Sequence, residues 1–140
     1  MDPMTPAHVL ESALYVDDLD AAVAFYRDAF SLALIGRVPG RHAFLRCGPG
    51  VLLLFVAAAT EVPGPPGPLQ VPPHGARGPG HLAFAAEPHG IEAWAARLQA
   101  LGIPVEKALA WPGGARSLYL RDPSGNSVEI AEARLWAGGA

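Results

Sequence analysis

The sequence predicts an α+β fold of two βαβββ modules that form a curved mixed sheet, with the helices on its outer face. Two observations support this prediction. The same order of strand and helix patterns occurs twice, each time within about 50 residues, which is too long for a solenoid unit and too few copies for an array. A segment rich in proline and glycine separates the two halves.

The first module is expected over residues 7–59. Residues 8–16 are apolar and rich in β-prone residues, which predicts a strand, and the pair Asp17-Asp18 then marks a helix start. Apolar residues at helical spacing continue this helix as far as Phe30. Short apolar segments bounded by glycine and proline turns predict three more strands, over 32–38, 42–47 and 51–56.

The second module, over residues 81–134, repeats this order. Residues 81–86 predict a strand, and apolar residues at helical spacing from Ile91 to Leu101 predict a helix. Gly102 is placed to end that helix, because the residue after a helix often adopts a left-handed conformation. Three further strands are expected over 104–108, 115–121 and 126–132.

Residues 60–80 form the connector between the modules. Their prolines and glycines cannot continue a helix or a central strand, and a loop of this length usually acts as a lid, a binding loop or a linker. The 140 residues are expected to form one domain, 1–140, that contains both modules and the connector.

Composition and charge exclude several classes of function. Ten Lys+Arg against 13 Asp+Glu give a net charge of −3, and Lys107 is the single lysine, so no nucleic-acid partner is expected. The longest apolar stretch, Val51 to Ala59, is far shorter than the roughly 20 residues of a membrane span. The N-terminus lacks a secretory signal pattern and Cys47 is alone, which together favour a cytoplasmic protein.

Strand alternation places three metal-competent side chains on one side of the predicted sheet. Each module must turn its larger apolar face toward its helix, so Glu11, His81 and Glu129 are expected on the opposite, concave side. A buried carboxylate costs free energy unless it is paired or coordinated, and metal coordination offsets that cost. A hydrogen-bonded polar cluster of the same residues is an alternative explanation.

Three motifs are distinctive: LYVDDL at 14–19 with AFYR at 24–27, GPGHLAF at 78–84, and RSLYLRDPSGNSVE at 116–129. They resemble the vicinal oxygen chelate superfamily, which includes glyoxalase I, bleomycin-resistance proteins, fosfomycin-resistance transferases and extradiol dioxygenases. The resemblance extends from about Ala7 to Glu132. It implies a homodimer, and a cavity in the curved sheet where Glu11, His81 and Glu129 ligate a metal ion.

Two departures from the family pattern bear on the implied metal site. Many members carry a histidine on the first strand, but the motif register here selects Glu11, and His8 lies at the opposite strand parity. Members with glyoxalase I activity use a fourth ligand, a glutamate on the last strand of the first module. This chain reads Val51-Leu52-Leu53-Leu54-Phe55 there, so the resemblance implies three ligands and does not favour glyoxalase I activity.

The function predicted on this basis is that of a metal-dependent enzyme acting on a small oxygen-chelating substrate by Lewis-acid catalysis, as a lyase, isomerase, transferase or dioxygenase. One imidazole and two carboxylates favour Zn, Mn, Ni or Mg over iron. Three protein ligands leave positions open for water or substrate, as in catalytic sites. The resemblance also implies that one glutamate can leave the metal and act as a base, which makes Glu129 and Glu11 the candidate catalytic residues.

Five further residues are candidates for substrate binding. Strand parity or nearby turns place them where they can reach the same cavity, and an arginine could hold an anionic substrate. An ordinary salt bridge or a solvated head is the alternative for each arginine, and packing is the alternative for Trp111. They are Tyr15, Arg46, Trp111, Arg116 and Tyr119.

The alternative function is a non-catalytic protein that sequesters a drug or metabolite, of the bleomycin-resistance type. Such proteins need no metal ligands, so the Glu-His-Glu set counts against this alternative. A small molecule is the expected partner in both cases, with neither nucleic acid nor a membrane involved.

Overall fold

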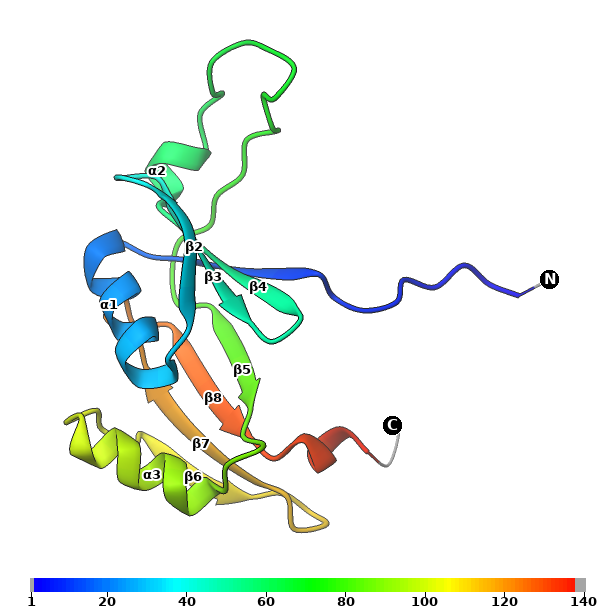
Figure 1. The fold of residues 1–140 in the computed structure, drawn as a ribbon, viewed down its shortest axis with the longest axis vertical. Helices are drawn as coiled ribbons and strands as arrows, with labels where there is room; N and C mark the ends of the chain where they lie inside the picture. Colours follow the sequence, from blue (N-terminus) through cyan, green and yellow to red (C-terminus); the bar gives the residue numbers. More distant parts are fainter. Residues whose placement is uncertain (1, 138–140) are drawn as a thin grey trace. The chain divides into compact units, whose positions relative to one another are not determined.

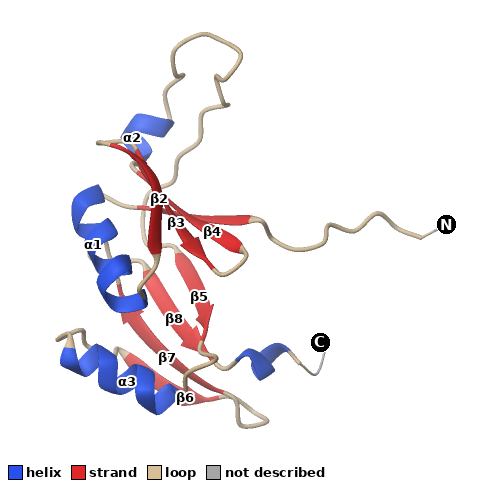
Figure 2. Cartoon of the chain, viewed as in Figure 1, coloured by secondary structure: helices blue, strands red, loops and turns tan. Residues whose placement is uncertain are grey.

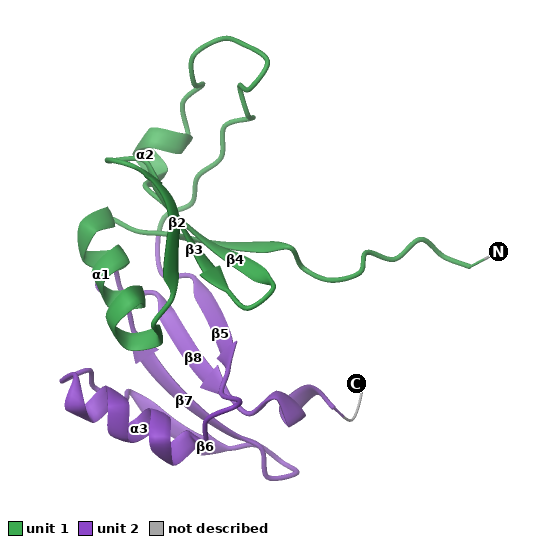
Figure 3. Cartoon of the chain, viewed as in Figure 1, with its two compact units in different colours: residues 1–77 green, residues 78–140 purple. Residues whose placement is uncertain are grey.

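The computed structural model describes residues 2–137, and it divides into two compact units, residues 1–77 and 78–140 (Figure 3). We call them unit 1 and unit 2 and describe each by itself. Each unit contains a strand, a helix and three further strands in chain order (Figure 1, Figure 2). The predicted α+β fold of two βαβββ modules is therefore confirmed.

Unit 1 is a four-stranded mixed sheet with a helix on one face. Its elements are β1 (Glu11–Tyr15), α1 (Leu19–Phe30), β2 (Ala33–Val38), β3 (His42–Cys47), β4 (Gly50–Phe55) and the short helix α2 (Ala57–Thr60). The strand order is β1-β4-β3-β2, with β1 parallel to β4 and the other neighbours antiparallel. Helix α1 packs against β3 and β4.

Unit 2 repeats this topology. Its elements are β5 (His81–Ala85), α3 (Ile91–Ala100), β6 (Lys107–Ala110), β7 (Arg116–Arg121), β8 (Ser127–Ala131) and the 3₁₀ helix η1 (Ala133–Trp136). The strand order is β5-β8-β7-β6, with β5 parallel to β8. Helix α3 packs against β7 and β8, so each helix covers one face of its own sheet.

The predicted helix boundaries follow from local capping. The Asp18 carboxylate accepts a hydrogen bond from Ala21 N at 3.0 Å, which satisfies one of the unpaired amides at the start of α1. At the end of α3, Gly102 adopts φ +70°, a left-handed conformation that costs glycine little. Both residues thus act as the sequence predicts.

The core of each unit consists of the strand residues that point toward the helix. Leu45 and Leu54 in unit 1 and Leu120 and Ile130 in unit 2 are fully buried there. Directly paired residues of neighbouring strands share a face, so the other parity forms the face away from the helix. That face carries the polar candidates, which are Glu11, Tyr15 and Arg46 in unit 1 and His81, Tyr119 and Glu129 in unit 2.

Two short helices and the starts of two strands differ from the sequence prediction. Strand β1 begins at Glu11, where its ladder with β4 starts, instead of at residue 8. Helix α2 forms where the apolar stretch that ends β4 passes into Ala57-Ala58-Ala59, because alanine has the highest helix propensity. Helix η1 also follows directly on a strand. Strand β6 begins at Lys107 instead of residue 104, since its ladder with β7 starts at the Lys107–Tyr119 pair. Among residues 2–137, no helix has the length and apolarity to cross a membrane.

Candidate active site

His81 and Glu129 form the centre of the polar face of unit 2. His81 Nε2 lies 3.3 Å from Glu129 Oε1. Glu129 is only 5% exposed, whereas the His81 side chain is about half exposed, at 53%. The structure therefore brings together two of the three predicted metal ligands, one buried carboxylate and one imidazole that solvent can reach.

The backbone fixes the orientation of the His81 ring. His81 pairs with Ser127 of β8, and its Nδ1 lies 3.0 Å from the Ser127 carbonyl oxygen. A carbonyl only accepts hydrogen bonds, so Nδ1 carries a proton and donates. Nε2 then faces Glu129 Oε1 with either a second proton or a lone pair. Metal-binding histidines are commonly held in this way, with one ring nitrogen donating to a carbonyl.

A chain of hydrogen bonds orients the other oxygen of Glu129. The Ser117 hydroxyl donates to Glu129 Oε2 at 2.7 Å, and Trp111 Nε1 donates to that hydroxyl oxygen at 2.8 Å. Ser117 is 1% exposed, so its hydroxyl is held away from water. Because the Ser117 oxygen accepts a hydrogen bond from Trp111, the hydroxyl hydrogen of Ser117 points to the Glu129 carboxylate. Trp111, one of the predicted substrate-binding residues, thus acts on Glu129 through Ser117.

Tyr119 lies beside the carboxylate on the neighbouring strand. It pairs with Glu129 in the β7–β8 ladder, and its ring stacks near that of His81 with a centroid distance of 6.2 Å. Burial raises the pKa of Tyr119 first, and the negative charge of Glu129 and a hydrogen bond to it raise the pKa further. The phenol therefore stays protonated at neutral pH and serves as a donor.

Two buried side chains of the turn 122–126, Asp122 and Asn126, hold β5 and β8 together at the start of both strands. Asn126 is 1% exposed, and its side-chain oxygen accepts a hydrogen bond from Gly80 N at 2.7 Å. Its amide nitrogen donates to Asp122 Oδ2 at 2.9 Å, and its backbone N donates to Asp122 Oδ1 at 2.9 Å. Gly80 directly precedes His81, so this turn sets where the imidazole enters the polar face.

The sheet registers relate the two units position by position. Glu11 is the first residue of β1, and His81 is the first residue of β5. Two residues further along these strands are Ala13 and Ala83. Leu53 pairs with Ala13 as Glu129 pairs with Ala83. Leu53 therefore occupies in unit 1 the place that Glu129 occupies in unit 2, and it lies in the segment where the family pattern would put the fourth ligand.

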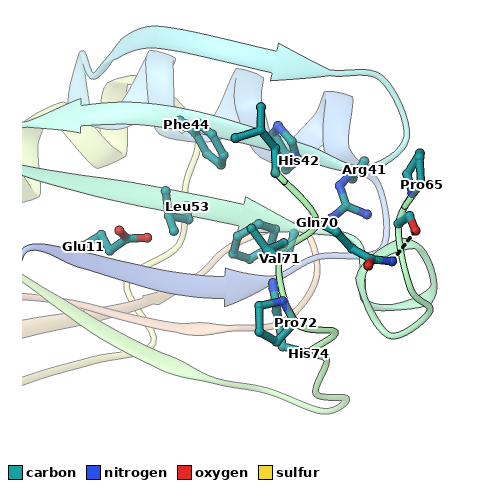
Figure 4. A pocket seen from close by; sticks show the side chains of 13 residues that line it. Glu11, Arg41, His42, Phe44, Leu53, Pro65, Gln70, Val71, Pro72 and His74 are labelled. Atoms are coloured by element: carbon teal, nitrogen blue, oxygen red, sulfur yellow. Dashed lines mark hydrogen bonds between the residues drawn. The ribbon is translucent and has the colours of Figure 1, made fainter. Parts of the chain in front are cut away.

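Unit 1 carries a pocket on the face away from α1 (Figure 4). Its volume is about 620 Å³, and strands β1, β3 and β4 form its floor while the connector forms its cover. The residues that line it include one carboxylate, one guanidinium and several aromatic rings. They are Glu11, Arg41, His42, Phe44, Leu53, Phe55, Gly64, Pro65, Leu69, Gln70, Val71, Pro72 and His74.

His74 fastens the connector to the sheet. Its Nδ1 lies 2.5 Å from the Tyr15 hydroxyl, and its backbone N donates to the Thr60 carbonyl at 3.0 Å. Its ring also meets Phe55 edge-on, with a centroid distance of 4.6 Å. Tyr15, a predicted substrate-binding residue, is therefore engaged in holding the pocket cover in place.

His42 gives a testable pH dependence to unit 1. Burial, and then the charge of Arg41, lower the pKa of His42 below its ordinary value. The unfolded chain, with a histidine pKa of about 6.5, then takes up a proton that the folded chain does not, so stability is complete above that pH and is lost below it. We expect the melting temperature to fall between about pH 7.5 and about pH 5.5, and to fall less in His42→Phe. An unchanged pH dependence in this variant would contradict the assignment.

The two arginines predicted to bind substrate lie in different surroundings. Arg116 pairs with Glu92, with a nitrogen–oxygen distance of 2.5 Å, and with Glu132 at 3.6 Å. The Arg116 hydrogen bonds lower the pKa of Glu92 to about 2, so this guanidinium is engaged with carboxylates of unit 2. Arg46 is exposed, and it pairs with Val51, which pairs with Glu11. The residues that line the pocket include Arg41 and not Arg46.

Sequence reasoning missed several residues that shape these sites. Ser117 was visible only as a strand residue of the right parity, and its bond to Glu129 depends on the side chain of Trp111. Arg41 precedes β3, where strand parity says nothing about direction. The signal that could have marked it is its position directly before the alternating aromatic residues His42 and Phe44.

The donor chemistry of unit 2 fits a divalent metal ion. An imidazole nitrogen and a carboxylate oxygen converge, and their remaining polar atoms are fixed by Ser127 and Ser117. Within either unit, the residues that the structure describes contain no group of three or more His, Cys, Asp or Glu side chains suited to one metal ion. Unit 2 thus offers two donors.

Comparisons with known proteins agree with the fold. A structure of lactoylglutathione lyase from Agrobacterium tumefaciens is 46% identical, covers 95% of this chain and 98% of its own, and superposes with a TM-score of 0.89. A structure of SMU.1112c is 30% identical, with coverage of 91% and 100% and a TM-score of 0.66. A variant of the fosfomycin resistance protein FosX from Listeria monocytogenes, complexed with Mn(II) and 1S,2S-dihydroxypropylphosphonic acid, is 20% identical, with coverage of 94% of each chain and a TM-score of 0.68.

A comparison with curated proteins gives no match. A family profile, however, matches residues 5–130, which is most of the sequence and includes both units. The motifs, the duplicated βαβββ topology and this match lead to the same assignment. The chain belongs to the Glyoxalase/Bleomycin resistance protein/Dioxygenase superfamily.

Proposed function

We propose that the protein is a metal-dependent enzyme that acts on a small oxygen-chelating substrate by Lewis-acid catalysis. The observation that carries this proposal is the pair formed by His81 Nε2 and Glu129 Oε1 at 3.3 Å, with every other polar atom of the two side chains oriented by a neighbour. Hydrogen-bond donors orient this buried carboxylate, and its ion pair among residues 2–137 is with His81. A metal ion would balance its charge.

His81 and Glu129 would be two of the ligands, and we propose Glu11 as the third. Support for Glu11 is its position in β1, which is equivalent to that of His81 in β5. We also propose that the protein is a homodimer, so that the three ligands come from one chain or from two copies of it. Zn, Mn, Ni or Mg suits this donor set better than iron.

The residues around Glu129 define the chemistry available. A bound divalent ion would polarise a substrate oxygen as a Lewis acid. Ser117 and Tyr119 donate to the Glu129 carboxylate and orient it, which keeps its basic oxygen toward His81. Glu129 or Glu11 would then accept a proton from the carbon or oxygen next to the polarised group. The half-exposed face of His81 leaves a route for substrate to enter.

The reaction class is narrowed by the relatives. The Agrobacterium protein, 46% identical, is named a lactoylglutathione lyase, which supports a lyase or isomerase reaction for this chain. Leu53 argues against the four-ligand site of glyoxalase I, because a leucine side chain cannot coordinate a metal ion. We therefore propose related proton-transfer chemistry on a different α-hydroxycarbonyl or thiol-containing substrate.

Metal analysis and an activity screen test this proposal. Protein purified without chelator is expected to contain about one divalent ion per chain by elemental analysis. Screening of α-hydroxycarbonyl, catechol and thiol compounds, with methylglyoxal plus glutathione as one arm, is expected to reveal a turnover that EDTA abolishes. Metal-free protein that binds no added Mn²⁺, Zn²⁺, Ni²⁺ or Mg²⁺ would contradict the proposal.

The indole N–H of Trp111 offers a finer test. Trp111→Phe keeps an aromatic ring but removes the donor to Ser117, so the Ser117 hydroxyl is free to turn away from Glu129. Loss of such an orienting contact typically weakens metal binding by about tenfold to a hundredfold, and we expect this loss in a Mn²⁺ titration calorimetry experiment. Trp136→Phe is the matched control, because Trp136 is exposed. Equal Mn²⁺ affinities in both variants would show that metal binding does not need the hydrogen bond from Trp111 to Ser117.

A second candidate is the non-catalytic sequestering function. The pocket of unit 1 favours it, because that pocket is complete without any metal ligand from unit 2. The two functions differ in their dependence on metal: a sequestering protein binds its ligand equally well with and without EDTA and releases it unchanged.

A further inference from the structure

The pocket of unit 1 has a size suited to a small organic ligand. Its volume of about 620 Å³ lies within the range typical of ligand sites. The floor is formed by strand residues and the cover by residues 64–74 of the connector. Because His74 is bonded to both Tyr15 and Thr60, the cover is fastened at one end of the pocket.

The walls of the pocket are rich in aromatic rings and apolar side chains. The rings of His42 and Phe44 are parallel, with an interplanar angle of 1° and a centroid distance of 4.4 Å, and Phe55 meets both nearly edge-on. Two apolar side chains of the cover, Leu69 and Val71, are 90% and 56% exposed. A flat ligand between the aromatic rings and these two cover residues would bury apolar surface on both of its faces. Burial of apolar surface is the main source of affinity in such sites.

Arg41 supplies a positive charge at one end of the pocket (Figure 4). One guanidinium nitrogen, Nη1, donates to the Ala59 carbonyl at 2.9 Å, which fixes the position of the group. Arg41 takes part in none of the ion pairs formed among residues 2–137. The other donors of the guanidinium can therefore bind an anion, and the planar fork of an arginine suits a carboxylate.

Glu11 lies at the opposite end, so the pocket is long and has unlike charges at its two ends. Glu11 is the first residue of β1. Tyr15, four residues later, pairs with Phe55, which pairs in turn with His42, the residue after Arg41. At about 3.3 Å per residue this separation corresponds to about 13 Å of strand. An elongated ligand could thus contact Arg41 with one end and lie beside Glu11 with the other.

We propose that this pocket binds the flat, apolar body of an aromatic anion, with the anionic group on Arg41 and the opposite end directed toward Glu11. The inference that this anion is the substrate rests on the proposed function. Binding itself requires only residues of unit 1, so it can be tested without metal.

Titration calorimetry on EDTA-treated protein tests the pocket with three probes. 2-Naphthoate carries both the ring system and the charge, 2-naphthamide carries the ring system without the charge, and acetate carries the charge alone. We expect 2-naphthoate to bind at least about tenfold more tightly than 2-naphthamide, since a hydrogen bond to a charged group is worth more than a neutral one, and acetate not to bind detectably. Equal affinities for the acid and the amide, or no binding of either, would overturn the proposal.

A pair of arginine variants locates the charge. Arg41→Gln is expected to abolish the preference for 2-naphthoate over 2-naphthamide, because glutamine is neutral and lacks the planar fork of donors that binds a carboxylate. Arg27→Gln is the matched control, since Arg27 is an exposed arginine of α1 and the change in net charge is the same. A preference retained in Arg41→Gln, or lost in Arg27→Gln, would overturn the assignment. If Arg41→Gln does not fold, the comparison of acid and amide on the wild-type protein still decides the question.

The same titrations separate this inference from the proposed function. Mn²⁺ affinity is measured in parallel, and Arg41→Gln is expected to leave it unchanged, because Arg41 lies at the end of the pocket away from Glu11. Loss of the acid preference with normal Mn²⁺ binding would refute the pocket alone. Absence of Mn²⁺ binding with a normal acid preference would refute the metal site alone.

Discussion

Glu129→Gln is expected to abolish both metal binding and turnover while leaving the fold intact. Glutamine has nearly the same shape and can still accept the hydrogen bond from Ser117, so the packing of β8 is retained. It lacks the negative charge that would hold a cation. Loss of a residue that merely orients a ligand weakens metal binding by about tenfold to a hundredfold, so loss of the ligand itself should exceed this range.

Stability measurements distinguish this outcome from misfolding. A carboxylate that is 5% exposed carries a desolvation cost, which the neutral amide avoids. The metal-free Glu129→Gln variant is therefore expected to melt at or above the temperature of the metal-free wild type in scanning calorimetry. Mn²⁺ should raise the melting temperature of the wild type and leave that of the variant unchanged.

His81→Ala and a matched pair of controls complete this test. His81→Ala is expected to lose Mn²⁺ binding as Glu129→Gln does, because it removes the only imidazole of the proposed ligand set. Glu106→Gln is the carboxylate control, since Glu106 is half exposed and pairs with Arg121. His89→Ala is the histidine control, since His89 lies in the turn before α3. A Glu129→Gln variant with wild-type Mn²⁺ affinity would refute Glu129 as a ligand.

The fold was predictable because the sequence carries local signals for strands, namely alternation and turn residues, and for helices, namely capping residues. Alternation and turn residues defined β3 over the residues that the structure shows, and Asp18 marked the start of α1 by a mechanism that needs no tertiary contact. Strand parity also placed His81 and Glu129 on one side of their sheet. The 3.3 Å contact between them follows from the parallel pairing of β5 with β8, which sequence alone did not give.

The remaining parts of the site depend on contacts between side chains. The bond from Trp111 to Ser117 requires a particular path of the segment between β6 and β7. The path of the connector over the sheet is set by His74 and its bond to Tyr15, 59 residues away in sequence. No periodicity encodes such contacts, so the Arg41 end of the pocket and the role of Ser117 became visible only in the structure.

Asn126→Ala is expected to destabilise the protein by about 2–6 kcal/mol. The side chain is 1% exposed and is hydrogen-bonded to both Gly80 N and Asp122 Oδ2, so its removal leaves a part-buried amide without its acceptor and a buried carboxylate with one donor fewer. Each loss of this kind costs about 1–3 kcal/mol. Equilibrium unfolding in urea measures the change. Gln99→Ala removes an amide side chain from an exposed helix position and should change the stability by less than about 0.5 kcal/mol.

The same variant is expected to weaken Mn²⁺ binding although Asn126 is not a proposed ligand. The hydrogen bond from Asn126 to Gly80 holds the residue before His81. Its loss lets the start of β5 move away from β8, which increases the distance between the His81 and Glu129 side chains. Leu98→Ala separates this effect from general destabilisation. Leu98 is fully buried, its loss should cost about 2–5 kcal/mol, and it lies on the helix side of the sheet. Weaker Mn²⁺ binding in Asn126→Ala than in an equally destabilised Leu98→Ala would show that the turn positions the imidazole, whereas equal affinities would limit Asn126 to a structural role.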